Sequence, residues 1–153
     1  MDYRKRVLRL RRRLKGFDAL LVTSRQNVRY LTGFTGSAGF VFIGPDTDLF
    51  VTDFRYKEQA VSEVNSCEVR VDSKSMVSTL KSLCKKGRSG KSRKIKRLGF
   101  EPSVSYALYS ELKEAKPGPA LIPMGDTLER MRELKDEAEL ALIKVAVQIA
   151  EEA

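Results

Sequence analysis

The sequence contains no histidine in its 153 residues. Without imidazole the chain lacks the commonest general base, the histidine-dependent nucleophile pairs of hydrolases, and every metal site that needs a histidine ligand. Metal sites built from carboxylates alone remain possible. We therefore predict that this chain contributes no catalytic residue and no metal site of its own.

Cysteine is also scarce, with only Cys67 and Cys84. Two cysteines this far apart are too few for a disulfide framework or a zinc site, so we interpret them as ordinary thiols in a reducing cytoplasm. No apolar run approaches the ~20 residues that a membrane helix needs. The first sixteen residues are charged throughout and do not resemble a secretory signal. We expect a cytoplasmic, globular protein with no membrane partner.

The net charge of +9 comes from two segments of the chain. Residues 1–15 hold eight basic residues and one acid, and residues 85–97 hold eight basic residues and no acid. Such clusters suggest a nucleic-acid-binding module, because phosphate affinity grows with lysine and arginine contacts. Two observations argue against nucleic-acid binding. The first segment has an apolar stripe that must be buried, and the second has no aromatic residues on which bases could stack. Nucleic-acid binding is therefore kept only as the alternative function.

Apolar periodicity predicts that helices and strands alternate along the chain. Helices are expected in the first fifteen residues and over 25–31, 55–64, 74–87, 103–115 and 126–153. Strands are expected over 18–24, 38–44, 49–54, 67–73, 97–102 and 117–125, the second and third forming an antiparallel hairpin. This order predicts an α/β fold with a mixed sheet of about six strands and helices on both faces.

The last predicted helix carries a continuous apolar face through residues 134–153. This face consists of Leu134, Ala138, Leu142, Val145 and Ile149. Neither glycine nor proline follows to stop the helix. Either the helix folds back on the domain, or it is the first helix of a second domain. We favour the second interpretation, which divides the chain into a domain of residues 1–133 and the beginning of another at 134–153.

Three stretches carry ordered motifs: "DALLVTSRQNVRYLTGFTGSAG", "LFVTDFRYKEQA" and "MRELKDEAELALIKVAVQIAEEA". In this order they resemble the amino-terminal domain of the creatinase and Xaa-Pro aminopeptidase (aminopeptidase P, prolidase-like) family of metallopeptidases. The resemblance implies a fold similar to ribonuclease H. It also implies a following "pita-bread" catalytic domain, in which Asp, His and Glu ligands hold two divalent, manganese-like metal ions. There a metal-bridged hydroxide attacks the carbonyl next to proline.

From this resemblance we expect a non-catalytic domain with three kinds of partner. It would contact its own carboxy-terminal catalytic domain, help to form a homodimer, and shape the site where the partner subunit binds a proline-containing peptide. The parent enzyme would be an Xaa-Pro aminopeptidase, a dipeptidase or a creatinase-like amidinohydrolase. The missing catalytic domain decides among these specificities.

The loop 33–39 contains three glycines, Gly33, Gly36 and Gly39. The resemblance implies that this loop reaches the active site of the partner subunit. Its glycines would allow close approach to a substrate or a neighbouring chain, while Thr35 and Ser37 would offer hydroxyl groups. Phe34 would supply an apolar wall for a proline ring instead of packing in the core. The alternative is a hairpin entry loop whose glycines serve only turns.

The turn 52–56 reads TDFRY and supports two interpretations. Asp53 could cap the helix that follows, and Arg55 could pair with Asp53, which would make the turn structural. The resemblance implies a second role, because in creatinase-like relatives an aromatic residue and an arginine near this turn contact the substrate carboxylate across the dimer. Phe54 and Arg55 are the counterparts in this sequence. We favour the cap and ion pair over substrate contact.

A nuclease of the ribonuclease H type is a further alternative, since its fold would be similar. That chemistry needs three or four carboxylates gathered around two metal ions. Asp18, Asp53 and Glu101 flank predicted strands, but at opposite ends of them. The sequence therefore shows no such cluster.

Overall fold

The structure is a computed structural model that describes residues 1–85, 94–115 and 118–152. Its centre is a mixed sheet in the strand order β4-β3-β2-β1-β5-β6. The strands are β1 (Ala19–Val22), β2 (Phe40–Ile43), β3 (Asp48–Thr52), β4 (Glu68–Val71), β5 (Arg97–Phe100) and β6 (Ala120–Pro123). β2 pairs antiparallel with β1 and β3, whereas the other three pairs are parallel. The predicted mixed sheet and its hairpin are confirmed.

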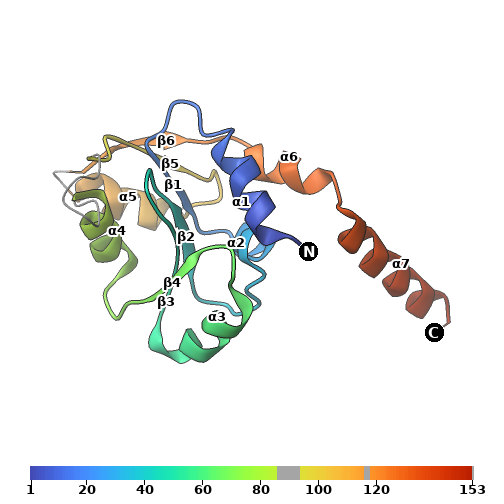
Figure 1. Ribbon diagram of the computed structural model, residues 1–153. Coiled ribbons are helices and arrows are strands. Elements are labelled where there is room, and N and C mark those ends of the chain that lie inside the picture. The colour runs from blue at the N-terminus through green and yellow to red at the C-terminus, as the bar shows by residue number, and fades with distance from the viewer. Residues whose placement is uncertain (86–93, 116–117, 153) are drawn as a thin grey trace.

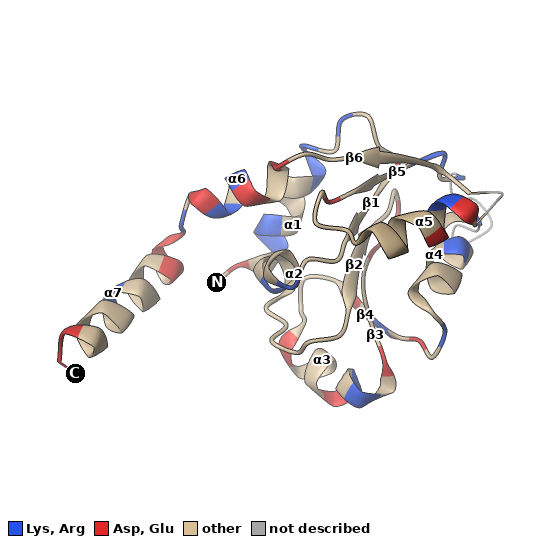
Figure 2. Ribbon diagram, turned by 180° about the vertical axis from the view of Figure 1, so that it is seen from behind, with Lys and Arg blue, Asp and Glu red and all other residues tan. Residues whose placement is uncertain are grey.

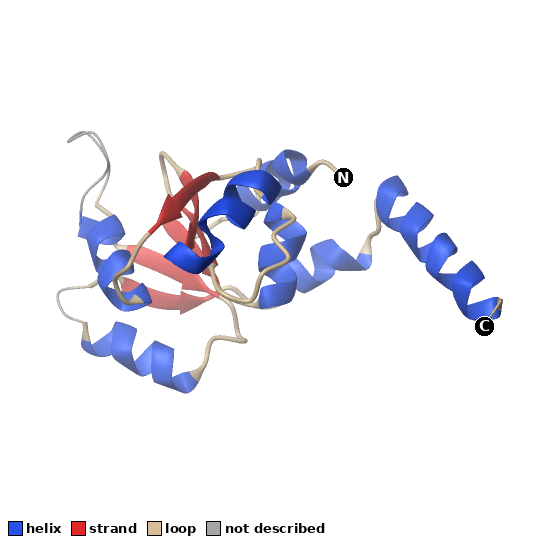
Figure 3. Cartoon of the chain, turned by 90° about the horizontal axis from the view of Figure 1, so that it is seen from below, coloured by secondary structure: helices blue, strands red, loops and turns tan. Residues whose placement is uncertain are grey.

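Helices cover both faces of the sheet (Figures 1 and 3). One face packs against α1 (Tyr3–Arg11), α2 (Arg25–Thr32), α3 (Lys57–Glu63) and α6 (Thr127–Glu133), with a 3-10 turn, η1 (Phe54–Tyr56), before α3. The other face packs against α4 (Met76–Lys85) and α5 (Tyr106–Glu114). The predicted α/β arrangement is therefore confirmed. Among the described helices, none is both long and apolar enough to cross a bilayer.

The sheet separates two apolar cores because successive strand residues point to opposite faces. In β1, Leu20 and Val22 join the core beneath α1 and α2, whereas Ala19 and Leu21 join the core beneath α4. All four residues of β1 are buried, as expected for a strand in the middle of a sheet covered on both sides. The candidate loop 33–39 leaves α2 and enters β2, so it is anchored at both ends to the first core.

The end of the chain differs from the single helix predicted over 126–153. α6 ends at Glu133, and a separate helix, α7 (Glu137–Glu151), begins after Asp136. The Asp136 side chain accepts a hydrogen bond from the Glu139 amide, and the Glu139 side chain accepts one from the Asp136 amide. This capping box starts a new helix in a new direction. α7 projects away from the sheet (Figure 1), and its apolar side chains are exposed.

Candidate functional site

The loop 33–39 is held against α3 by a network centred on Thr35. The Thr35 amide donates to Glu63 Oε2 at 2.7 Å, and the Thr35 hydroxyl donates to Glu63 Oε1 at 2.8 Å. Gln59 Nε2 donates to Thr35 Oγ1 at 2.9 Å and to Glu63 Oε1 at 3.0 Å. Despite these bonds Thr35 remains exposed. The structure thus fixes the backbone of the loop while leaving one face of Thr35 open to solvent.

Ser37 is the second exposed hydroxyl of the loop. Its Oγ lies 2.7 Å from the hydroxyl of Tyr56, which belongs to η1. This hydrogen bond to Ser37 lowers the pKa of the Tyr56 hydroxyl, since the bond favours the charged form. The loop is therefore joined to both η1 and α3, and the three segments form one surface. We call this surface, made of loop 33–39, η1 and α3, the loop–turn surface.

Although Phe34 belongs to the loop 33–39, its side chain is not exposed on the loop–turn surface. Its side chain is 2% exposed and belongs to the first core. The ring centroid lies 4.6 Å from that of Phe50 and 5.7 Å from that of Tyr56, the second contact being edge to face. The prediction that Phe34 is free of core packing is therefore wrong. An aromatic ring between two other rings gains more from burial than from exposure at a loop.

The loop glycines also have a structural role that the sequence did not reveal. A Cβ atom on Gly36 would lie 2.3 Å from Cζ of Phe34 and 2.8 Å from the Tyr56 ring. A Cβ atom on Gly39 would lie 2.5 Å from Cζ of Phe50. Gly33 ends α2 in the left-handed conformation, at φ 83°. These glycines bring the loop against aromatic rings of its own chain, and their approach to another chain remains a prediction.

The turn 52–56 confirms the favoured interpretation as a cap and ion pair. Asp53 Oδ1 accepts from the Arg55 amide at 2.9 Å and from Arg55 Nε at 3.1 Å, and Asp53 Oδ2 accepts from Nη2 at 2.7 Å. The Arg55 hydrogen bonds hold the pKa of Asp53 below its ordinary value. Phe54 points outward and is 76% exposed. The loop–turn surface therefore displays Thr35, Ser37, Phe54 and Arg55, with Phe54 as its large apolar group.

A buried network that sequence reasoning missed positions the start of α2. Glu101 follows β5, is fully buried, and accepts from the amides of Thr23 and Ser24 at 2.6 and 2.8 Å. It also accepts from Asn27 Nδ2 at 2.6 Å, and the same Nδ2 donates to Glu129 at 2.8 Å. Burial raises the pKa of Glu101. The sequence placed Glu101 beside a predicted strand, but only the three-dimensional contacts identify its hydrogen-bond partners.

The carboxylates considered for a nuclease are not gathered together. Asp18 precedes β1 and accepts from the amides of Lys96 and Arg97, both at 2.8 Å. Glu101 follows β5, which runs parallel to β1, so the two acids lie at opposite ends of the sheet. Asp53 follows β3, which β2 and β1 separate from β5. Each of the three carboxylates accepts hydrogen bonds from a different set of residues. This arrangement does not fit a two-metal site.

The first basic segment is partly used inside the domain. The apolar stripe predicted for this segment consists of Val7, Leu10 and Leu14. Val7 and Leu10 are buried, Leu14 is partly buried, and Arg6 is buried with them. Arg11 forms an ion pair with Asp48 at 2.6 Å and donates to the Gly44 carbonyl at 2.9 Å. Figure 2 shows the remaining basic positions along α1. Most of the second basic segment, 85–97, lies outside the described residues. The interpretation of this segment therefore stays a prediction from the sequence.

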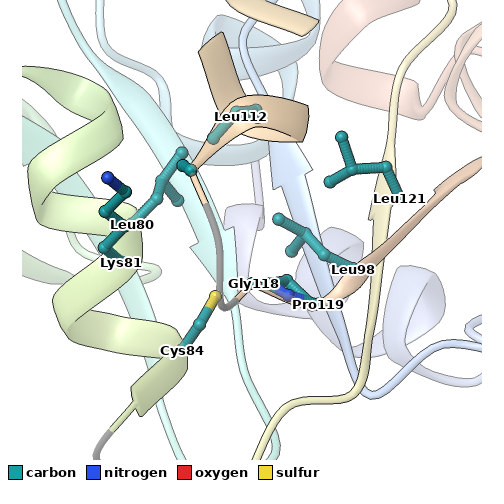
Figure 4. A pocket seen from close by; sticks show the side chains of 9 residues that line it. Leu80, Lys81, Cys84, Leu98, Leu112, Gly118, Pro119 and Leu121 are labelled. Atoms are coloured by element: carbon teal, nitrogen blue, oxygen red, sulfur yellow. The ribbon is translucent and has the colours of Figure 1, made fainter. Parts of the chain in front are cut away.

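Both cysteines are free thiols. Burial raises the pKa of Cys67 and of Cys84 to about 11 in each case. Cys84 lines a narrow apolar pocket between α4, α5 and the strands β5 and β6 (Figure 4). Its free volume of about 20 Å³ is room for one water-sized molecule. The pocket is therefore too small to hold a peptide or a cofactor.

The family described as "Creatinase/Prolidase N-terminal domain" matches residues 5–134 of the chain. The uncharacterized peptidase YqhT of Bacillus subtilis is 38% identical over 139 residues, which are 90% of this chain and 38% of that protein. The solved Xaa-Pro dipeptidase from Bacillus anthracis matches with a TM-score of 0.85 and 33% identity, over 97% of this chain and 41% of its own.

A solved aminopeptidase P from Streptococcus thermophilus matches differently. It has a TM-score of 0.72 and 31% identity, and the match covers 86% of this chain but 99% of the solved chain. This chain spans less than two-fifths of the length of the curated relatives that it matches. The similarity therefore concerns one domain of longer peptidases.

Proposed function

The chain belongs to the creatinase/prolidase N-terminal domain family, and from this premise we propose that it is the non-catalytic domain of an Xaa-Pro peptidase. The observation that carries the proposal is the family match over residues 5–134, together with a fold like that of the Bacillus anthracis dipeptidase. In this role the domain supports a catalytic domain and shapes a substrate site. The parent enzyme would cleave peptides that contain proline and would act in the cytoplasm.

The partner of α7 in this proposal is the catalytic domain. α7 begins at Glu137, after the family match ends at residue 134. Its apolar residues Leu142, Val145 and Ile149 are 50–63% exposed. An exposed apolar face of this length is expected to be covered in the working protein. The longer Bacillus anthracis dipeptidase, 41% of which is matched, covers 97% of this chain, whereas the aminopeptidase structure, 99% of which is matched, covers 86%. This difference supports our assignment of 134–153 to a second domain.

Metal chemistry belongs to that second domain in our proposal. Two divalent, manganese-like ions would activate a water molecule and polarise the peptide carbonyl next to proline. The present chain has no histidine, and the carboxylates Asp18, Asp53 and Glu101 are held apart by the sheet. These residues do not fit a dinuclear site. The chemical contribution of this domain is therefore limited to binding and positioning.

The loop–turn surface is our candidate for contact with the substrate of a partner subunit in a homodimer. Phe54 offers an exposed ring that can pack on a proline ring, and Arg55 offers a cation for a carboxylate. Arg55 is pre-oriented by Asp53, which holds two of its nitrogen atoms. Thr35 and Ser37 add hydroxyl groups beside them. Phe34 supports this surface from beneath through its contact with Tyr56.

We predict that this chain alone does not hydrolyse Xaa-Pro dipeptides or longer Xaa-Pro peptides. A longer protein that carries this chain together with its proposed catalytic domain should hydrolyse them when manganese is added. The assay is release of the amino-terminal residue, measured for both proteins at equal concentration. Turnover by the repurified short chain, or an extended and folded protein inactive on every such peptide, would contradict the proposed function.

We further predict that Phe54→Ala in the extended enzyme lowers kcat/KM by roughly tenfold to a hundredfold, as expected for a lost contact of about 1–3 kcal/mol. Because the ring is exposed, the fold should be unaffected. Tyr106→Ala is the matched control, since Tyr106 is an aromatic residue that is 83% exposed on α5, on the other face of the sheet. Equal kinetics for the Phe54 variant and the unchanged enzyme would exclude Phe54 from the substrate site.

A further inference from the structure

Arg6 is the most deeply buried basic side chain of α1, with 5% of its surface exposed. Its Nη1 donates to the backbone carbonyl of Tyr30 at 3.0 Å. Its guanidinium carbon lies 4.3 Å from the centroid of the Tyr30 ring and 5.4 Å from that of Tyr3. These contacts tie the guanidinium to α1 and α2. A buried arginine that is fixed in this way cannot swing out to solvent.

The other edge of the same guanidinium faces the beginning of α7. Arg6 Nη2 forms an ion pair with Asp136 and another with Glu139, the second at 3.1 Å. Asp136 and Glu139 are the two residues of the capping box that starts α7. Figure 2 shows acidic positions at the α7 end that lies nearest the domain. Arg6 therefore contacts the first turn of a helix whose sequence position is 130 residues away.

These contacts fix an angle as well as a distance. The capping box makes the first turn of α7 a rigid unit, because each of its two side chains is bonded to the backbone of the other residue. A planar guanidinium whose Nη1 is held by α2 and whose Nη2 pairs with two carboxylates of this unit restrains the rotation of the unit as well as its separation from α1. The end of α6 is held separately, because the Tyr30 hydroxyl donates to the Met131 carbonyl at 3.1 Å.

We propose that Arg6 is a positioning residue that sets the direction in which α7 leaves the domain. The exposed remainder of α7 has no described contact that could perform this task, since its residues from 140 onward are exposed. In the proposed function, on which this consequence depends, Arg6 would thereby orient the catalytic domain relative to the loop–turn surface. The positioning itself is a property of the present chain and is tested on it.

The test is the alignment of α7 relative to the sheet, measured by residual dipolar couplings of backbone amides in a weakly aligned sample. In the unchanged chain, couplings from α7 and from the sheet should fit one alignment tensor. In Arg6→Met, the tensor magnitude fitted to α7 should fall by roughly twofold or more, because the helix samples several directions. The sheet couplings and the helical carbon shifts of α7 should not change, since its capping box remains.

Arg9→Met is the matched control, because Arg9 lies in the same helix but is exposed. It should leave the α7 couplings unchanged. Arg6→Lys should restore only part of the alignment, because an ammonium group lacks the planar fork of arginine. Should Arg6→Met fail to fold, Asp136→Asn combined with Glu139→Gln removes the two charges while leaving Arg6 in place, and the same loss of α7 alignment is expected.

If α7 stays aligned with the sheet in Arg6→Met or, should that variant fail to fold, in Asp136→Asn combined with Glu139→Gln, the proposal is overturned. The proposal is also overturned if Arg9→Met lowers the alignment of α7 as much as Arg6→Met does. The effect would then come from the loss of one positive charge on α1 and not from the specific contacts of Arg6. None of these outcomes depends on peptidase activity. Failure of the positioning role and failure of the proposed function can therefore be told apart.

Discussion

Replacing Phe34 with alanine is expected to destabilise the chain by about 3–5 kcal/mol, the range measured for truncating buried phenylalanines. The ring is 2% exposed and packs between Phe50 and Tyr56, so its removal leaves a cavity that rigid neighbours cannot fill. The measurement is urea unfolding of the chain, followed by circular dichroism. The midpoint should fall while the slope of the transition stays constant.

Phe54→Ala in the same chain is the matched control, because that ring is 76% exposed and lies in the adjoining η1. Its stability should change by less than about 0.5 kcal/mol, as is usual for surface positions. The expectation from the sequence, that Phe34 forms an apolar wall and does not pack in the core, implies a small stability loss for Phe34→Ala as well. Similar, small losses for both variants would restore that first interpretation of Phe34 as a solvent-facing wall.

Glu101→Ala should destabilise the chain by about 2–6 kcal/mol, since each of two donors left without an acceptor costs about 1–3 kcal/mol. The amides of Thr23 and Ser24 lose their acceptor, and Asn27 Nδ2 keeps only its hydrogen bond to Glu129. These groups set the start of α2, and with it the loop 33–39 at the other end of that helix. Glu114→Ala, at an exposed position of α5, is the control and should be nearly neutral.

The Glu101 carboxyl also makes stability depend on pH. Burial raises its pKa above 4.5, so the folded state binds the proton more tightly than the unfolded state. The stability that follows from this raised pKa is therefore fully present below the unfolded-state pKa of Glu101. It is lost as the pH rises through the folded-state pKa. Glu101→Gln does not titrate, so the stability of the unchanged chain relative to this variant should fall as the pH rises. A pH-independent difference between the two would contradict the raised pKa.

Much of the fold could be predicted from local patterns in the sequence. Two short apolar runs in 38–54, separated by the turn residues PDTD, indicated two strands of a hairpin, and both strands formed. Val7 and Leu10 indicated the buried face of the first helix. Asp53 indicated a cap and an ion pair with Arg55, and both are present. These features could be predicted because the interacting residues are close in sequence, so their spacing alone defines their relative positions.

The candidate site required tertiary structure. Phe34 is buried because β3 brings Phe50 beneath it and η1 brings Tyr56 beside it. The sequence pattern around residue 34 does not predict either contact. Gly36 and Gly39 are needed because those same rings lie where a Cβ atom would be. The break between α6 and α7 has a local signal in Asp136 and Glu139, but the continuous apolar pattern across 134–149 concealed it.

By itself, the sequence determined the α/β class, the hairpin, the absence of histidine chemistry and, through its ordered motifs, the family. Only the tertiary structure decided which side chains of the loop 33–39 face solvent and that Arg6 contacts the first turn of α7. The physical reason is the same in both cases. Contacts between residues distant in sequence depend on how whole elements pack, and the energy of that packing outweighs what any single residue prefers locally.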